Sequence, residues 1–323
     1  MSRRDHQKGA ALLSILMIVA ALSVAALVAV SAIARQTDLS KAASRRADAG
    51  WAVYSAEAIA LSAITTLQRD AGNQSLAVRL GLGETQMVPV QGGVVSLQVS
   101  DATNCFNVNA LAGPEEGAAR LARLGWSRLL QDLGLSVADA NDLTDALADW
   151  IDADSTPRRG GAEDGYYLTL SPPYRAANQP MDSPRELAAV RGYTGELREA
   201  LAPLACTLQQ PSLVRLNVDT LTPQQAPLLR ASYSDAIGLA AAERILANRP
   251  MQGWGSVDAF ETLPDIRAIP PGQKRTDMIG VTSNLFLVEG FVALDAGRWP
   301  FSFMIQSDGG QSPRIVWRRM GEE

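Results

Sequence analysis

An uninterrupted apolar stretch near the start of the chain constrains the fold more than any other feature of the sequence. The 25 residues from Ala10 to Ala34 carry no charge, Arg35 follows at once, and the nine residues before Ala10 have a net charge of +2. About 20 apolar residues suffice for a helix that spans a bilayer. A secretory signal is one alternative, because Ala32-Ile33-Ala34 has the small residues of a cleavage site, but signal cores are only about 7–15 residues long. We therefore expect residues 10–34 to cross a membrane once.

The apolar stretch is also predicted to begin a longer helix. From residue 10 to residue 71 there is no proline and only one glycine, Gly50. Apolar residues continue beyond the membrane at three- and four-residue spacing, namely Trp51, Tyr54, Ala58, Leu61 and Ile64. Such a stripe is typical of a helix face buried against other elements. The sequence predicts a helix of about 60 residues, half of it in lipid. Its second half packs on a globular head, with Trp51 and Tyr54 in the core.

Two distant parts of the chain show the alternation of strands. One predicted strand is 94–99, and three more lie at 285–294, 301–305 and 314–317. The residues 113–250 between them carry helical patterns, with capping boxes that start at Ser183 and Thr222. We expect an α+β protein in which a large helical domain interrupts one antiparallel sheet. The predicted divisions are 1–9 (leader), 10–34 (membrane), 35–104 (helix and first strands), 105–212 (helical insertion), 213–280 (helical segment) and 281–323 (last strands).

A six-residue pattern occurs twice in the helical part. Residues 106–111 resemble residues 216–221, and each precedes a helix that starts with proline. Either duplication of a segment or chance similarity between short helix caps explains this repeated pattern. The segment 213–280 resembles helix-hairpin-helix modules, which bring backbone N–H groups to DNA phosphate through a glycine-flanked hairpin. Here Ser232-Tyr233-Ser234-Asp235 has no glycine, and the chain has a net charge of −5. No nucleic-acid partner is expected.

Histidine-based chemistry is excluded if the leader is removed. The single histidine, His6, lies ahead of the apolar stretch. A chain without histidine has no Ser-His-Asp triad, no histidine zinc site and no histidine general base. We expect a protein that is not an enzyme.

One acidic cluster has the composition of a cation site. Asp152, Asp154, Glu163 and Asp164 surround the flexible pair Gly160-Gly161. Oxygen ligands at this density suit calcium, which takes six to eight of them. The loop is not an EF-hand, because Pro157 stands where that motif needs glycine. A solvated acidic loop, paired with Arg158 and Arg159, is the alternative.

The two cysteines, Cys105 and Cys206, flank the helical insertion. They are natural disulfide partners in an oxidising compartment and buried thiols in a reducing one.

Several motifs, in order along the chain, together resemble the general secretion pathway protein K family, minor pseudopilins of the type II secretion system. They are Lys8-Gly9-Ala10, which is similar to a prepilin cleavage site, then residues 104–111, 145–167, 173–178 and 186–193. The resemblance implies cleavage between Gly9 and Ala10 by a prepilin peptidase and a pilin-like fold with an inserted helical domain. It also implies calcium at Asp152, Asp154, Glu163 and Asp164, with Asn178 and Glu186 as further candidates.

The resemblance further implies a place in the cell and a set of partners. The protein is expected in the bacterial inner membrane with a periplasmic head. It would join minor pseudopilins of the I, J and H types above the major pseudopilin. A minor pilin of a DNA-uptake or adhesive pilus and a membrane-anchored hydrolase are the alternatives.

Ser14 is the fifth residue counted from Ala10. Most pilins and pseudopilins carry glutamate there, whose charge in lipid calls for a partner. In a filament that partner is the N-terminal ammonium of the subunit above. A subunit with Ser14 accepts a follower but has no such charge with which to follow another. We expect it to start the pseudopilus and to cap its tip.

Overall fold

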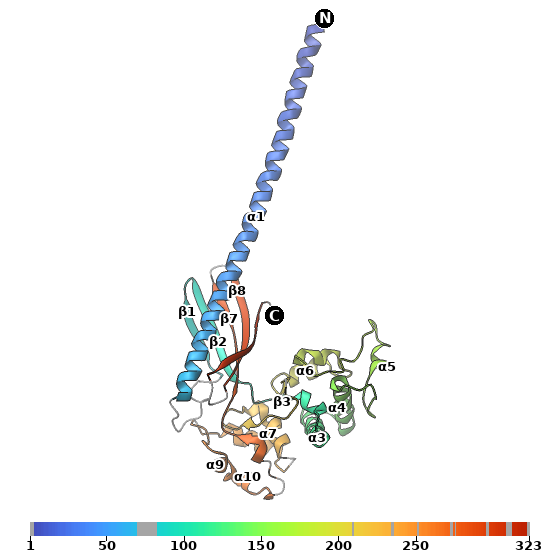
Figure 1. The fold of residues 1–323 in the computed structure, drawn as a ribbon, viewed down its shortest axis with the longest axis vertical. Coiled ribbons are helices and arrows are strands. Elements are labelled where there is room, and N and C mark those ends of the chain that lie inside the picture. Colours follow the sequence, from blue (N-terminus) through green and yellow to red (C-terminus); the bar gives the residue numbers. More distant parts are fainter. Residues whose placement is uncertain are drawn as a thin grey trace.

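The computed structural model describes residues 3–69, 83–208, 210–233, 236–250, 252–271, 274, 276–294, 297–307 and 312–321, and within the first helix it describes the side chains of residues 16–66. That helix, α1, runs without interruption from Arg3 to Arg69. Figure 1 shows its N-terminal part standing clear of the rest of the molecule. This helix is long and apolar enough to span a membrane, and no other helix among the described residues is.

The C-terminal half of α1 packs on a five-stranded sheet. The strands, in spatial order, are β1 (Thr85–Val90), β2 (Gly93–Asp101), β7 (Leu285–Leu294), β8 (Gly297–Gln306) and β9 (Arg314–Met320). All neighbours are antiparallel, and the register places the buried side chains of Val99, Val288 and Phe303 opposite one another. The predicted single antiparallel sheet, split in sequence by helices, is confirmed. The strand β1 was not predicted, because its apolar alternation is short and interrupted by Pro89.

The buried face of α1 differs from the predicted one. Trp51 is 72% exposed and Tyr54 is 50% exposed, so the expectation that both lie in the core is wrong. The side chains that α1 buries against the sheet are mostly small, namely Ala49, Ala52, Val53, Ala56, Ala60 and Ile64. Alanines let the helix axis approach the sheet closely, and a tryptophan in the same row would hold the two apart.

An ion pair between a buried carboxylate and an exposed arginine attaches the last strand to the helix. Glu57 is 4% exposed, and its carboxylate lies 3.0 Å from Nε of Arg318 on β9. Burial raises the pKa of Glu57, and the Arg318 charge opposes this rise. The guanidinium of Arg318 also lies 5.0 Å from the centre of the Tyr54 ring. Tyr54 therefore contacts the last strand from the flank of the helix rather than from the core.

The chain leaves the sheet after β2, forms the helical part, and returns before β7. The helices of this part are η1 (Val108–Ala112), α3 (Glu116–Asp132), α4 (Val137–Ile151), α5 (Asp164–Tyr167), η2 (Pro184–Ala189), α6 (Gly195–Leu201), η3 (Pro223–Gln225), α7 (Ala226–Ser232), α8 (Leu239–Ala247), α9 (Val257–Glu261), α10 (Pro264–Arg267) and η5 (Thr276–Met278). Both predicted capping boxes form, at Ser183 and at Thr222, although the helices they start are short. One apolar cluster extends through this part from Phe106 to Ile279.

The repeated six-residue pattern has the same local structure in both places. β3 (Phe106–Asn107) pairs in parallel with β4 (Ala205–Cys206), and β5 (Leu216–Asn217) pairs in parallel with β6 (Ile279–Gly280). After each first strand an asparagine side chain accepts a hydrogen bond from the backbone two residues on, from Asn109 in one copy and from Asp219 in the other. The shared strand, turn and closing partner favour duplication over chance.

A buried polar junction joins the helical part to the sheet. Asp101, at the end of β2, accepts hydrogen bonds from the hydroxyls of Thr220 and Ser283, the first at 2.6 Å. The side chain of Asn104 accepts from the backbone N–H of Asn217 at 2.8 Å and donates to its carbonyl at 3.2 Å. These hydrogen bonds hold the two ends of the helical part side by side, next to the end of β2 and the start of β7.

The corrected helix face gives the first prediction. Ala56→Leu puts a large side chain between α1 and the sheet, and we expect it to lower the free energy of unfolding by about 1–3 kcal/mol. Trp51→Ala, on the exposed face, should change it by no more than about 0.5 kcal/mol. Urea unfolding of the detergent-solubilised chain measures both. A large loss of stability with Trp51→Ala and none with Ala56→Leu would show that the predicted stripe containing Trp51 is the buried face.

Candidate metal site

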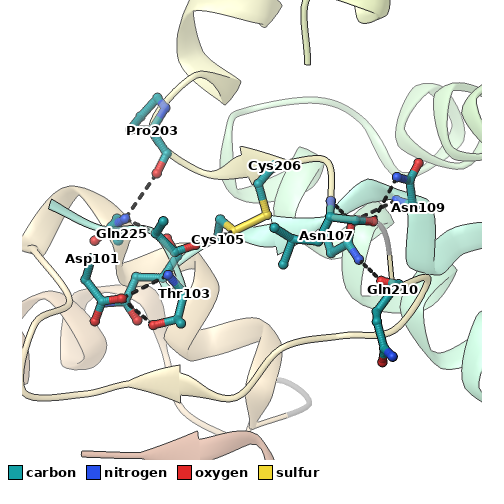
Figure 2. Close-up of a disulfide and its surroundings, with 12 residues drawn as sticks. Asp101, Thr103, Cys105, Asn107, Asn109, Pro203, Cys206, Gln210 and Gln225 are labelled. Atoms are coloured by element: carbon teal, nitrogen blue, oxygen red, sulfur yellow. Dashed lines mark hydrogen bonds between the residues drawn. A yellow bond between two sulfur atoms is a disulfide. The ribbon is translucent and has the colours of Figure 1, made fainter. Parts of the chain in front are cut away.

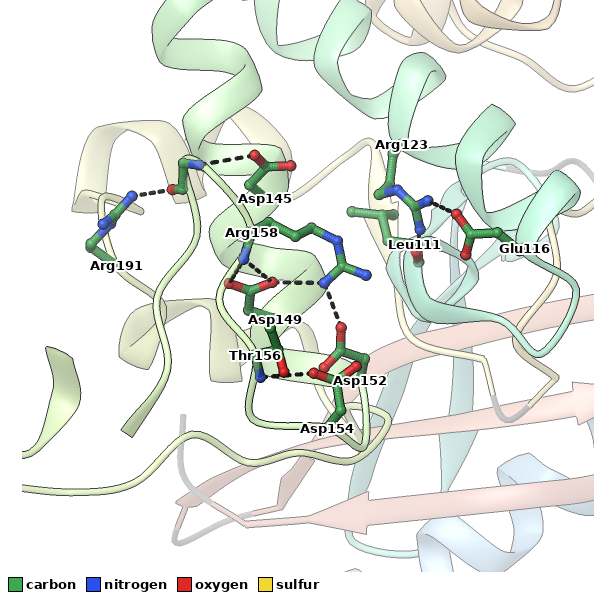
Figure 3. A network of polar contacts seen from close by, with 11 residues as sticks. Leu111, Glu116, Arg123, Asp145, Asp149, Asp152, Asp154, Thr156, Arg158 and Arg191 are labelled. Carbon is green, nitrogen blue, oxygen red and sulfur yellow. Dashed lines mark hydrogen bonds and ion pairs between the residues drawn. The ribbon is translucent and has the colours of Figure 1, made fainter. Parts of the chain in front are cut away.

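The acidic cluster lies where α4 ends. Ser136 caps the start of α4 by accepting a hydrogen bond from the N–H of Asp139, and the helix buries Ala140, Leu147 and Ile151. Its last turn carries Asp149, and Asp152 is the residue that follows the helix. The loop then turns back, so that Arg158 comes beside Asp149 (Figure 3). Further along the loop, Glu163 approaches Asp152.

Arg158 neutralises the innermost carboxylate of this turn. Asp149 is fully buried, and its oxygens accept from the backbone N–H of Arg158 at 3.0 Å and from Nη1 at 2.6 Å. Burial raises the pKa of Asp149, and these hydrogen bonds oppose the rise. The same Nη1 also binds one oxygen of Asp152. The solvated-loop alternative is therefore right about Arg158, whereas Arg159 is exposed and forms no ion pair with a described side chain.

Three predicted ligands meet in the loop. Asp152, Asp154 and Glu163 each offer a carboxylate oxygen, and these oxygens lie within 4.8 Å of one another. Both oxygens of Glu163 and one of Asp152 are buried and accept no hydrogen bond. Burial, followed by repulsion from Asp149, Asp152, Asp154 and Asp164, raises the pKa of Glu163 to about 7. Calcium takes oxygens at about 2.3–2.6 Å, so oxygens spaced this way fit around one ion.

The other predicted ligands have different surroundings. Asp164 accepts from Arg175 at 2.6 Å and from the N–H of Ala176 at 3.1 Å, so both of its carboxylate oxygens are engaged. Asn178 has a buried amide oxygen with no hydrogen-bond partner, and its Nδ2 lies 3.5 Å from the Ser155 hydroxyl. Glu186 accepts from the backbone N–H groups of Asp182 and Ser183 as part of a capping box. The structure thus brings Asn178 toward the cluster and engages Glu186 elsewhere.

Two glycines allow the loop to fold back. A Cβ on Gly161 would lie 1.7 Å from an Asp149 oxygen, and one on Gly160 would lie 2.3 Å from an Asp142 oxygen. The N–H of Gly160 donates to Asp145 at 3.1 Å, and Arg191 donates to the carbonyl of Gly160. Sequence reasoning identified the pair as flexible. It missed that their lack of side chains makes room for α4, and it missed Asp149, whose signal was a carboxylate on the apolar face of a helix.

The disulfide closes the first copy of the repeated unit. Cys105 and Cys206 are bonded, across a separation of 101 residues (Figure 2). Beside them Asn107 donates to the carbonyls of Gln210 at 2.6 Å and Ser212 at 3.0 Å. No described cysteine is free. Of the two states left open by the sequence, the bonded one is present.

Three sequence-predicted positions lie in α1, outside the described side chains. Gly9 and Ala10, at the expected cleavage site, and Ser14, the expected tip determinant, belong to the part of the helix for which only the backbone is described. Their roles stay predictions.

Comparisons with known proteins agree on one family. Two family descriptions of type II secretion system (T2SS) protein K match the chain, at residues 104–210 and 216–282. Type II secretion system protein K of Pectobacterium carotovorum is 33% identical over 98% of each chain, and that of Aeromonas hydrophila is 37% identical over 83% of each. A crystal structure of the GspK-GspI-GspJ complex from enterotoxigenic Escherichia coli contains a chain that matches with a TM-score of 0.77 and 28% identity. That match covers 88% of this chain and 99% of the other.

A long helix with its C-terminal half on an antiparallel sheet, preceded by an apolar stretch, defines a pilin-like protein anchored in a membrane with a soluble head. The inserted helical part with its disulfide sets it apart from a plain pilin. The chain belongs to the type II secretion system protein K family, whose members are minor pseudopilins. The comparisons support this interpretation rather than a DNA-uptake pilin or a hydrolase.

The fold-back of the loop gives the second prediction. Gly161→Ala forces its new Cβ into the Asp149 carboxylate, so we expect it to lower the free energy of unfolding by about 1–3 kcal/mol. The matched control is Gly117→Ala in α3, where a Cβ meets nothing within 4 Å. That change should be neutral or stabilising by up to about 1 kcal/mol. Chemical denaturation compares the two, and equal effects would contradict the close approach of Gly161 to α4.

Proposed function

We propose that this chain caps the tip of the type II pseudopilus and starts its assembly, together with minor pseudopilins of the I and J types. The observation that carries the proposal is its likeness to a chain of the GspK-GspI-GspJ complex over 88% of its length. In this proposal a prepilin peptidase cleaves after Gly9. The helix from Ala10 then anchors the protein in the inner membrane, with the head in the periplasm. The H-type subunit and the major pseudopilin follow below.

The shape of the molecule supports a terminal position. Figure 1 shows the helical part beside and beyond the end of the sheet, on the side away from the N-terminal end of α1. In a filament whose subunits stack along their helices, this bulk would occupy the space of a subunit placed above. A subunit that blocks the layer above itself fits only at the end.

The residue at the fifth mature position agrees with this geometry. Ser14 offers no charge to the N-terminal ammonium of a preceding subunit, whereas the N-terminus of Ala10 still accepts the glutamate of a following one. The bulk of the helical part and the lack of a charge at Ser14 both disfavour a subunit above this one, so both point to the tip of the filament.

Tip capping gives the third prediction. Immunogold labelling of the head on isolated pseudopili should place gold at one end only, while antibody to the major pseudopilin labels the whole shaft. Ser14→Glu should leave the gold at the end, because the helical part still excludes a layer above. Gold from the wild-type head spread along the shaft would overturn the proposal.

The same proposal includes a calcium ion in the helical part. Asp152, Asp154 and Glu163 would hold it, and the amide oxygen of Asn178 is a further candidate. Support comes from the buried carboxylate oxygens of Glu163 and Asp152 that accept no hydrogen bond. An ion there would neutralise the repulsion within the cluster and join the end of α4 to the returning loop. Its part in this protein is structural, and no catalytic step belongs to the proposal.

Calcium binding gives the fourth prediction. Because a ligand that binds only the folded state stabilises it, calcium at 100 times its dissociation constant should add about 2.7 kcal/mol to the free energy of unfolding. Thermal unfolding of the purified chain should therefore shift upward with calcium and downward with chelator. Asp154→Asn keeps the size of the side chain and should abolish most of the shift. Glu199→Gln, an exposed position on α6 with the same loss of charge, should keep it. Equal melting curves with calcium and chelator would contradict the ion.

A further inference from the structure

The segment of α1 between the apolar stretch and the head is bare. All residues from 35 to 48 are exposed, and Ala49 is the first buried residue among the described side chains of the helix. At 1.5 Å per residue the bare segment is roughly 21 Å long. Figure 1 shows this part of the helix leading to the sheet with no other element beside it.

The bare segment is positively charged on one side. It carries Arg35, Lys41, Arg45 and Arg46 against Asp38 and Asp48, a net charge of +2 in a chain whose total is −5. None of these six side chains forms an ion pair with another described side chain. At about 100° per residue, the four basic residues fall within an arc of about 140°. We call these four residues the basic band.

The basic band continues the face that α1 buries further on. On the same helical arc, Ala52, Ala56 and Ala60 pack against the sheet. Where this face packs on the sheet its side chains are small and apolar, and where it is exposed its side chains are mostly cationic. A face that changes in this way at the edge of the head is suited to an anionic surface rather than to another packed helix.

The direction of the side chains brings them toward the membrane. Helical Cα–Cβ bonds tilt toward the N-terminus, which here is the side of the apolar stretch. Arg35 lies at the edge of that stretch, and Lys41 lies about 9 Å further along the axis. Arg45 and Arg46 lie about 15–17 Å along it, and their long side chains shorten this distance. The headgroup layer on each side of a bilayer is roughly 5–7 Å thick, and charges act over about another 8 Å at physiological ionic strength.

We propose that the basic band binds the phosphate groups of anionic phospholipids and so fixes the depth at which α1 lies in the membrane. One guanidinium group can bind two phosphate oxygens at once, and three of the four residues in the basic band are arginines. Asp38 lies on the same arc and lowers the positive electrostatic potential of the basic band without cancelling it. The inference rests on the membrane anchoring proposed above. It adds that the unassembled subunit is held by lipid headgroups, a contact that ends when the helix leaves the bilayer.

The test measures lipid selectivity around the full chain. The protein is inserted into phosphatidylcholine vesicles that hold a trace of spin-labelled phosphatidylglycerol or spin-labelled phosphatidylcholine, and electron paramagnetic resonance gives the fraction of each at the protein. Phosphatidylglycerol should be enriched about fivefold over phosphatidylcholine, and salt should reduce this enrichment. Lys41→Gln/Arg45→Gln/Arg46→Gln should remove most of it. Arg120→Gln/Arg185→Gln/Arg319→Gln removes three exposed charges from the head and should preserve it.

Two results would overturn the proposal. Equal association of the two lipids with the wild-type chain shows that the basic band does not select an anionic headgroup. Equal loss in both variants assigns the effect to the charge of the whole head. Carbonate extraction of the same vesicles separates this failure from a failure of anchoring. Protein that stays with the lipid is inserted, whereas protein that washes off would overturn the anchoring and the lipid contact together.

Discussion

The buried polar junction between Asp101, Asn104, Asn217, Thr220 and Ser283 is the constraint on which the rest of the head depends. Ser283 and Asp101 are 182 residues apart in sequence and meet at this point. Asn104 and Asn217 are almost fully buried, and a buried amide that loses its partners costs about 1–3 kcal/mol. Since each amide is satisfied in one arrangement, the junction fixes how the helical part sits on the sheet. It also places β7 beside β2, so that the sheet closes across the insertion.

The two copies of the repeated unit extend from this junction, and both have the same local structure. Each begins with a two-residue strand and an asparagine turn, and each is closed by a parallel strand from its own end. In the first copy Cys105 and Cys206 bond across that closure. In the second, Asp219 accepts from the N–H groups of Trp254 at 2.7 Å and Gly255 at 3.2 Å. The covalent bond thus stabilises the closure of the first copy, whereas the buried carboxylate of Asp219 holds the turn after β5 to the segment before α9. The acidic cluster lies in the loop region of the covalently closed copy.

The candidate site shows how far residue type predicts chemistry. The density of carboxylates predicted the cluster, and Asp152, Asp154 and Glu163 do meet. Asp164 was predicted alongside these three and Glu186 was a further candidate, but Asp164 accepts from Arg175 and Glu186 from the backbone of a capping box. Asp149 was not identified as important, because its burial and its pairing with Arg158 depend on the return of a loop across α4. A carboxylate is recognisable from sequence, whereas its partner is decided by backbone that comes from elsewhere.

The sequence by itself determined those features that depend on neighbouring residues. The long helix, the apolar stretch and both capping boxes follow from local composition and spacing, because contacts within a few residues stabilise them. The four predicted strands follow from the local alternation of apolar residues, although their partners do not. Tertiary structure decided which face of α1 is buried. Trp51 and Tyr54 are the larger apolar residues, yet the sheet packs on alanines, because close approach of backbone to backbone depends on size as well as on hydrophobicity. It also decided the edge strand β1 and the junction at Asp101, since strand pairing and buried hydrogen bonds join residues that are far apart in the chain.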